Sequence, residues 1–173
     1  MDTPVEHDQN RLYALAQSYL GRLQIPSCSL LLRHSDKLKA RLDVYDELRR
    51  KWVALTPEEW VRQHFVALMV NSLGYPRLRL ANEVTLKLNG MMRRADTVFY
   101  DDTLQPALIV EYKAPAIALS NEVLQQALRY NLVFNARGLV ICNGIDVYSV
   151  VNGNLTHGLI TCSDLMKGTP AQI

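Results

Sequence analysis

Two short apolar runs near the middle of the chain have the composition of paired strands. Residues 97–100 and 107–112 are rich in β-branched and aromatic side chains, and the Asp-Asp pair and the proline between them favour a turn. Side chains alternate along a strand, so Glu111 and Lys113 point to one face while the neighbouring apolar residues point to the other. The pattern predicts a hairpin whose second strand ends in a carboxylate and an ammonium group.

Three other stretches carry the signals of helices. Apolar positions within residues 12–23 recur at the spacing of an amphipathic helix. A capping box with proline at the first helical position, residues 56–59, predicts a helix that ends near residue 73. A third helix is predicted over residues 121–135, with Ser120 as its N-cap.

Further strands are predicted on both sides of the hairpin. Residues 84–88 alternate polar and apolar side chains, and Asn89-Gly90 is the strongest short hairpin signal in the chain. Residues 139–142 form an apolar run typical of a buried strand, and a second Asn-Gly pair can turn the chain into residues 145–151. The whole pattern predicts an α/β fold of the α+β type, in which a mixed sheet combines hairpins with one crossover.

The clearest candidate chemistry lies on the central hairpin. Asp96 and Glu111 would meet across the two strands and offer carboxylates to Mg²⁺ or Mn²⁺, with the backbone carbonyl of Tyr112 as a third oxygen ligand. Lys113 could then orient an attacking water molecule and offset charge on a phosphate. Taken alone, these charged side chains are better explained as a cross-strand ion pair on a solvated face.

Residues on the predicted helices could join this site. Gln126 and Tyr130 are four residues apart, share one helix face, and could hold a phosphate, a base edge or a water molecule on the metal. Without the hairpin, a partly exposed helix face would explain them better. Glu59, or Glu58 beside it, could supply another carboxylate, but capping of Thr56 already explains Glu59.

Other charged residues have weaker claims. Glu83 could add a carboxylate, although strands often begin with a charged residue at the solvent edge. Arg93 and Arg94 lie next to the proposed site, where they could contact phosphate. For Arg62 and Gln63, a phosphate contact is an alternative, but a solvated helix face is the better explanation.

Composition permits nucleic-acid binding without requiring it. The chain has 173 residues, 49% of them hydrophobic, and a net charge of +2 at pH 7. Any basic surface must therefore be local, and residues 49–51 are better explained as a solvated face.

The motifs occur in an order that resembles a known family. They are Arg-Arg-Ala-Asp96, Glu111-Tyr-Lys113-Ala-Pro, Gln126-x-x-x-Tyr130, Leu55-Thr-Pro-Glu-Glu-Trp-Val-Arg-Gln63, Leu73-Gly-Tyr-Pro76 and Ile141-Cys-Asn-Gly144. Together they resemble the PD-(D/E)XK nuclease superfamily, and more narrowly the N-terminal nuclease domain of the restriction (motor) subunit of type I restriction enzymes and its stand-alone relatives. The resemblance covers about residues 45–148, and Ala95 replaces the nominal proline.

The resemblance implies an α-β-β-β-α-β core and a catalytic triad of Asp96, Glu111 and Lys113, followed by the Gln-x-x-x-Tyr helix. It implies hydrolysis of DNA with Mg²⁺ or Mn²⁺. Because the phosphate loop GxxxxGK[ST] is absent from the sequence, an ATP-driven motor would come from another chain, as would specificity subunits. A homodimer is a further expectation. The rival hypothesis is a catalytically silent DNA-binding or assembly module with the same fold.

The sequence also suggests an organisation and a location. Residues 1–52 match no motif, so we expect an N-terminal helical or irregular extension, and a nuclease-like core over residues 53–173 packed with it as a single domain. The chain lacks an apolar run of transmembrane length and a signal sequence, and its three scattered cysteines fit reduced thiols. We expect a cytoplasmic protein that does not bind membranes.

Overall fold

The computed structural model describes residues 4–36, 41–88, 91–125 and 136–167. Among these residues, the helices with defined ends are α1 (Pro4–Leu20), α2 (Pro57–Asn71), α4 (Cys162–Lys167) and the short 3-10 helix η1 (Arg77–Arg79). One sheet consists of β1 (Leu32–His34), β2 (Leu42–Asp46) and β3 (Lys51–Ala54). The other consists of β4 (Leu80–Leu88), β5 (Met91–Tyr100), β6 (Pro106–Tyr112), β7 (Gly138–Cys142), β8 (Val147–Val151) and β9 (Asn154–His157).

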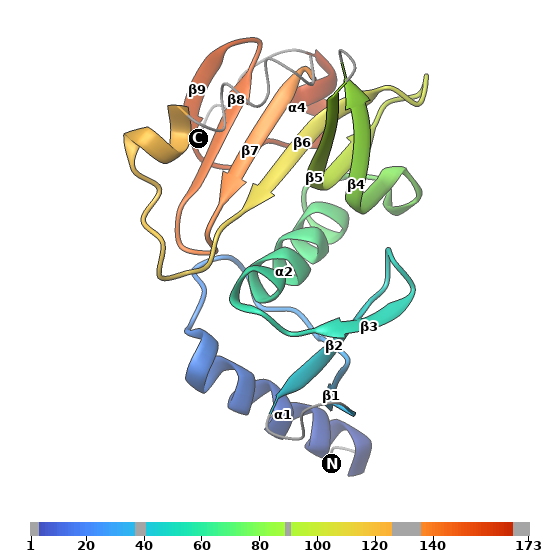
Figure 1. Ribbon diagram of the computed structural model, residues 1–173, viewed down its shortest axis with the longest axis vertical. Coiled ribbons are helices and arrows are strands. Elements are labelled where there is room, and N and C mark those ends of the chain that lie inside the picture. The colour runs from blue at the N-terminus through green and yellow to red at the C-terminus, as the bar shows by residue number, and fades with distance from the viewer. Residues whose placement is uncertain (1–3, 37–40, 89–90, 126–135, 168–173) are drawn as a thin grey trace.

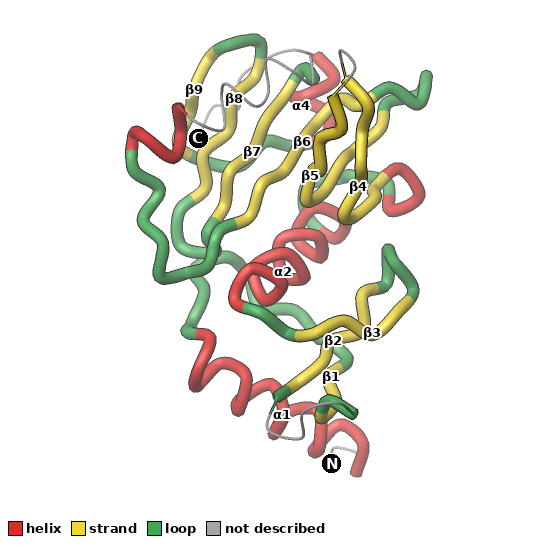
Figure 2. The backbone as a smooth tube through the Cα atoms, viewed as in Figure 1, coloured by secondary structure: helices red, strands yellow, loops and turns green. Residues whose placement is uncertain are grey.

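The two sheets lie on either side of α2. Figure 1 shows α2 between the larger sheet and the strands β2 and β3, with α1 beside the smaller sheet at the N-terminal end. The backbone view in Figure 2 shows the strands of the larger sheet side by side above α2. Because α2 is enclosed in this way, most of its circumference is buried.

The larger sheet is mixed, as predicted. Its order is β4-β5-β6-β7-β8-β9, and β6 pairs in parallel with β7 while the other neighbours pair antiparallel. One face packs on α2 through residues such as Phe65, and the other packs on Leu119 and Leu124. Since both faces are covered, all five residues of β7 are buried. Residues 121–125 are helical, so the predicted α-β-β-β-α-β order is confirmed.

The N-terminal part of the chain contains the three-stranded sheet, which the sequence pattern did not predict. The predicted helix within residues 12–23 is confirmed as α1, and Leu12, Ala16 and Leu20 are buried against β1 and β2. No helix in the described ranges has the length and apolar character needed to cross a membrane.

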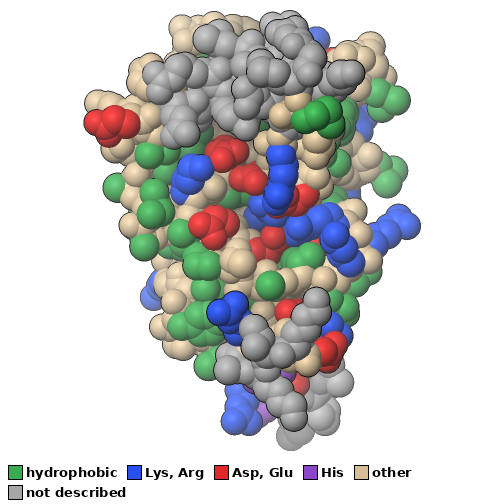
Figure 3. All heavy atoms as spheres, in the orientation of Figure 1, with side chains coloured by type: hydrophobic (Ala, Val, Ile, Leu, Met, Phe, Trp, Pro, Cys, Tyr) green, Lys and Arg blue, Asp and Glu red, His purple; other side chains and the backbone are tan. Residues whose placement is uncertain are grey.

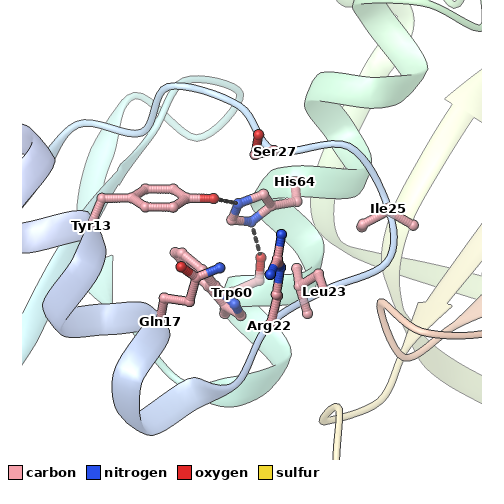
Figure 4. A pocket seen from close by; sticks show the side chains of 8 residues that line it. All are labelled: Tyr13, Gln17, Arg22, Leu23, Ile25, Ser27, Trp60 and His64. Atoms are coloured by element: carbon pink, nitrogen blue, oxygen red, sulfur yellow. Dashed lines mark hydrogen bonds between the residues drawn. The ribbon is translucent and has the colours of Figure 1, made fainter.

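Three aromatic side chains connect α1 to α2. Tyr13 Oη lies 2.7 Å from His64 Nε2, and His64 Nδ1 lies 2.8 Å from the carbonyl oxygen of Trp60 (Figure 4). A carbonyl oxygen can only accept, so Nδ1 carries the proton and donates to Trp60, while Nε2 of the neutral ring accepts from Tyr13. The arrangement fixes the ring of His64 between the two helices.

Candidate active site

Asp96, Glu111 and Lys113 line one cleft where β5 and β6 approach α2. The antiparallel register of these strands, extended by one pair, places Asp96 opposite Glu111. The backbone N–H of Tyr112 donates to Asp96 Oδ2 at 2.9 Å, which holds Asp96 against the end of β6. Lys113 follows directly, and the cleft has a volume of about 470 Å³. The structure therefore brings the three predicted side chains together.

Glu111 forms an ion pair with Lys113, whose Nζ lies 2.9 Å from Glu111 Oε1. Burial raises the pKa of Glu111, and the negative charge of Asp96 raises it further, whereas Lys113 and Arg62 lower it. Burial is the larger cause of the raised pKa, and the repulsion from Asp96 adds to it. A divalent cation held between the two carboxylates would offset this repulsion.

The donor atoms at this position suit a hard cation. Mg²⁺ commonly keeps several water molecules and binds one or two protein carboxylates, which Asp96 and Glu111 can provide. Within the described residues, no three His, Cys, Asp or Glu side chains are grouped so that they could hold a metal ion. Water and substrate oxygens would therefore complete the coordination.

Arg62 on α2 connects three acidic side chains around the cleft. Its guanidinium donates to Asp96 Oδ1 at 3.0 Å and to Glu59 Oε2 at 2.8 Å, and it lies 2.6 Å from Glu83 Oε1. Arg62 and Gln63 are both buried, so the prediction of a solvated face is wrong. Helical periodicity alone could not show that two sheets enclose α2. One local signal was present, because Glu59 precedes Arg62 by three residues and shares its helix face.

Glu59 takes part in this charge network and completes only half of the predicted capping box. Its backbone N–H donates to Thr56 Oγ1 at 3.1 Å, as expected of an N-cap. Its carboxylate instead accepts hydrogen bonds from Arg49, Arg62 and Gln63. Capping therefore does not explain Glu59, because hydrogen bonds from charged donors are stronger than one from a backbone N–H.

Glu83 reaches the cleft from within β4, not from its start as the sequence suggested. Its backbone has a φ of 57°, which is uncommon outside glycine, and the β4–β5 register omits the pair of Glu83 with Asp96. The carboxylate forms ion pairs with Arg62 and with Arg94, whose side chain is 68% exposed. A local break in strand pairing thus directs Glu83 to the cleft, with Arg94 on its solvent side.

Other predicted residues have different outcomes. Gln126 and Tyr130 lie outside the described residues, and so does the side chain of Arg93. Lys51 is exposed, as expected, but the Arg49 side chain is 14% exposed and lines the cleft, so the prediction of a solvated face is wrong for Arg49.

Charges of both signs lie close together on the molecule. Figure 3 shows acidic and basic side chains intermixed across the middle of one face. The lining of the cleft also combines several carboxylates with arginine and lysine side chains.

Comparison with protein families agrees with the motif order. The family model described as the N terminus of the type I restriction enzyme R protein (HSDR_N) matches residues 57–158, more than half of the chain. The chain belongs to this family. The HSDR_N match begins with the first residue of α2 and ends just after β9. It therefore includes Glu59, Arg62, Asp96 and Glu111, whereas Arg49 precedes it.

One solved structure shows the same fold at low sequence identity. A fragment described as an HsdR subunit of a type I restriction enzyme from Vibrio vulnificus YJ016 matches with a TM-score of 0.53 and 17% identity, over 66% of this chain and 25% of that one. A chain of the DrdV–DNA complex, solved by cryo-electron microscopy, has a TM-score of 0.45 and 22% identity, over 59% of this chain and 10% of that one. The HSDR_N chain thus spans a quarter of the Vibrio fragment. No curated protein sequence matches this HSDR_N chain.

Proposed function

We propose that this HSDR_N chain is a metal-dependent nuclease domain of a type I restriction system and hydrolyses phosphodiester bonds of DNA. The observation that carries the proposal is the pair of neighbouring carboxylates, Asp96 and Glu111, with Lys113 ion-paired beside them in one cleft. Family membership supports the restriction role. The repulsion between Asp96 and Glu111, which adds to the effect of burial on the pKa of Glu111, supports cation binding at this pair.

Asp96, Glu111 and the backbone carbonyl of Tyr112 would hold Mg²⁺ or Mn²⁺. The N–H and C=O groups of one strand residue point toward the same neighbouring strand. Because the N–H of Tyr112 donates to Asp96, its carbonyl is directed to the same side. When bound, such an ion lowers the pKa of a water molecule and stabilises negative charge on the phosphate.

The remaining residues of the cleft would position the reactants. The ammonium group of Lys113 would hydrogen-bond the attacking water molecule and balance charge on the phosphate. Arg94, exposed on the solvent side of the cleft, would contact a neighbouring phosphate, and we assign the same role to Arg93. Gln126 and Tyr130 would position the substrate or water from the following helix. Glu59 and Glu83 would act indirectly, because both bind Arg62.

The proposed partners are those of a type I restriction system. DNA is the proposed substrate, and we propose that separate subunits supply the ATP-driven motor and sequence specificity. One site cuts one strand at a time, so a double-strand break would require two copies, as in a homodimer, or two successive events. We place this activity in the cytoplasm.

A cleavage assay tests the proposal. Purified protein is incubated with supercoiled DNA in Mg²⁺, Mn²⁺ or a chelator, alongside Asp96→Asn and Lys113→Ala. Asp102→Asn and Lys51→Ala are the matched control variants. Each removes the same charge as one site variant, but at an exposed position away from the two carboxylates. We expect metal-dependent nicking by the wild type and the controls, and a loss of at least about 100-fold in both site variants.

The opposite result would favour the silent module. If no metal supports cleavage, and calorimetric titration with Mn²⁺ gives no more heat for the wild type than for Asp96→Asn, the proposed chemistry is wrong. DNA binding without turnover would then identify a binding or assembly role. Full cleavage by Lys113→Ala alone would remove only Lys113 from the mechanism.

A further inference from the structure

The turn between β2 and β3 brings Arg49 into the cleft. Asp46 Oδ1 accepts hydrogen bonds from the backbone N–H groups of Leu48 and Arg49 at 2.8 and 3.0 Å, which closes the turn. Arg50 then adopts a φ of 52° before the chain enters β3. The other oxygen of Asp46 accepts from Arg49 Nε. Asp46 thus fixes both the backbone and the side chain of Arg49.

A line of charged contacts leads from Arg49 to the proposed metal ligand. Arg49 Nη2 lies 2.5 Å from Glu59 Oε1, and the two side chains are 14% and 7% exposed. The second oxygen of Glu59 accepts from Arg62 at 2.8 Å, and Arg62 donates to Asp96 at 3.0 Å. Every link joins an ionised donor to an ionised acceptor, the strongest class of hydrogen bond in proteins.

A second set of contacts leads back from Asp96 to the same turn. Tyr112 donates to Asp96 through its backbone N–H, and its hydroxyl donates to Thr97 Oγ1 at 3.0 Å. Thr97 donates to Asn82 Oδ1 at 2.6 Å, and Asn82 Nδ2 donates to Asp46 Oδ2 at 2.8 Å. Asp46 is fully buried. The contacts therefore form a closed ring that joins the smaller sheet to the cleft.

We propose that Arg49 is a positioning residue for this site and fixes the orientation of Asp96 through Glu59 and Arg62. Arg49 has no contact with Asp96 itself. Without its guanidinium, Glu59 would keep Arg62 and Gln63 as donors but lose its second arginine, and Arg62 could move toward Glu59 and Glu83. Asp96 Oδ2 would still accept the hydrogen bond from the backbone of Tyr112. Asp96 Oδ1 would no longer be held in place by Arg62. The consequence for cleavage rests on the proposed nuclease function.

The test uses the full chain with Arg49→Met, Arg49→Lys and the matched control Arg50→Met. Arg50 is adjacent, exposed and of the same type. With Mn²⁺ and supercoiled DNA, we expect kcat of Arg49→Met to fall about 10- to 100-fold, because small displacements of catalytic groups have effects of this size. KM for DNA should change by less than about twofold, since substrate binding is not altered. Arg49→Lys should recover part of kcat, because lysine keeps the charge but not the two-pronged geometry.

Defined outcomes would overturn this proposal. Wild-type kcat in Arg49→Met, or a rise in KM with kcat unchanged, would exclude a positioning role, and the latter would indicate a direct phosphate contact. Equal loss in Arg50→Met would show a general effect of charge. If Arg49→Met does not fold, the comparison of Arg49→Lys with the wild type decides, and equal kcat in the two proteins would contradict the need for a guanidinium.

A measurement without DNA or metal separates this proposal from the proposed function. Nitrogen-15 NMR of the Arg62 guanidinium should show hindered rotation in the wild type, because its two Nη atoms are held by different partners. In Arg49→Met the signals should average, and in Arg50→Met they should not. Unchanged Arg62 signals in Arg49→Met would overturn the positioning role even if the protein is a nuclease. Averaged signals in a protein that does not cleave would support it while the nuclease function fails.

Discussion

The two carboxylates at the centre of the cleft have different cationic neighbours. Asp96 is held by Arg62 at 3.0 Å and by a backbone N–H, whereas Glu111 faces Lys113 at 2.9 Å. Burial and the charge of Asp96 together raise the pKa of Glu111. At the scale of single residues, Glu111 is therefore the carboxyl group whose titration reports on the charge of the whole site.

Neutralising Asp96 should lower the pKa of Glu111. In Asp96→Asn the coulombic repulsion between the two groups is absent, while burial still acts, so the pKa should fall part of the way toward its ordinary value. Carbon-13 NMR titration of the glutamate side chains in the metal-free protein measures this. Asp102→Asn, with a 70% exposed side chain, is the control and should leave Glu111 unchanged. An unaltered Glu111 pKa in Asp96→Asn would show that the two carboxylates do not interact.

At the scale of elements, the sequence pattern predicted the strands and the helix start that depend on residues close together in the chain. The β-branched runs predicted β5 and β6, and Thr56 predicted the start of α2. The smaller sheet escaped prediction because its strands are short and β2 turns a charged residue, Asp46, toward the interior. The burial of Asp46 depends on Arg49 and on Asn82, which is distant in sequence. The same reason applies to the cleft, where the triad motif was recognisable but the contacts of Arg62 with Asp96 and Glu83, which are distant in sequence, were not.

The two functions of the first turn of α2 can be separated by substitution. Thr56→Ala removes the N-cap acceptor and should cost about 1 kcal/mol of unfolding free energy, whereas Thr56→Ser should cost much less. Glu59→Gln suits a capping box equally well, but it leaves Arg49 and Arg62 without their shared anion and should cost about 3 kcal/mol. Urea denaturation of the variants measures both. If Glu59→Gln is as stable as the wild type, the ion pairs of Glu59 do not contribute to stability, and capping is enough to explain the residue.

At the scale of the whole molecule, α2 contributes side chains to the cores beside both sheets. One side packs under the six-stranded sheet, and Trp60 joins the cluster formed by α1, β1 and β2. The division into an extension over residues 1–52 and a core over 53–173 stays a prediction. The contacts of Trp60, His64 and Glu59 across that boundary indicate that the two parts are stabilised together.

The junction of α1 with α2 should make stability depend on pH. Burial lowers the pKa of His64, although its hydrogen bond to Trp60 opposes this. The unfolded chain therefore takes up a proton at a higher pH than the folded chain, so the stabilisation is complete above the ordinary pKa of 6.5 and is lost as the pH falls through the lowered value. Denaturation between about pH 7.5 and pH 5.5 should show this fall.

Two histidine variants identify the source of that dependence. His64→Gln should flatten the decline in unfolding free energy, whereas His34→Gln, at an exposed position, should retain it. Equal slopes in both variants would assign the effect to groups other than His64.

The closed ring of hydrogen bonds determines where this domain could be cut for transplantation into a fusion protein. The family-matched segment begins at residue 57, which makes the start of α2 an obvious junction. A graft made there would leave Glu59 without Arg49 and Asn82 without Asp46, in a region that is buried. A portable unit therefore has to start before Leu32, so that β1, β2 and β3 remain with the cleft that they support.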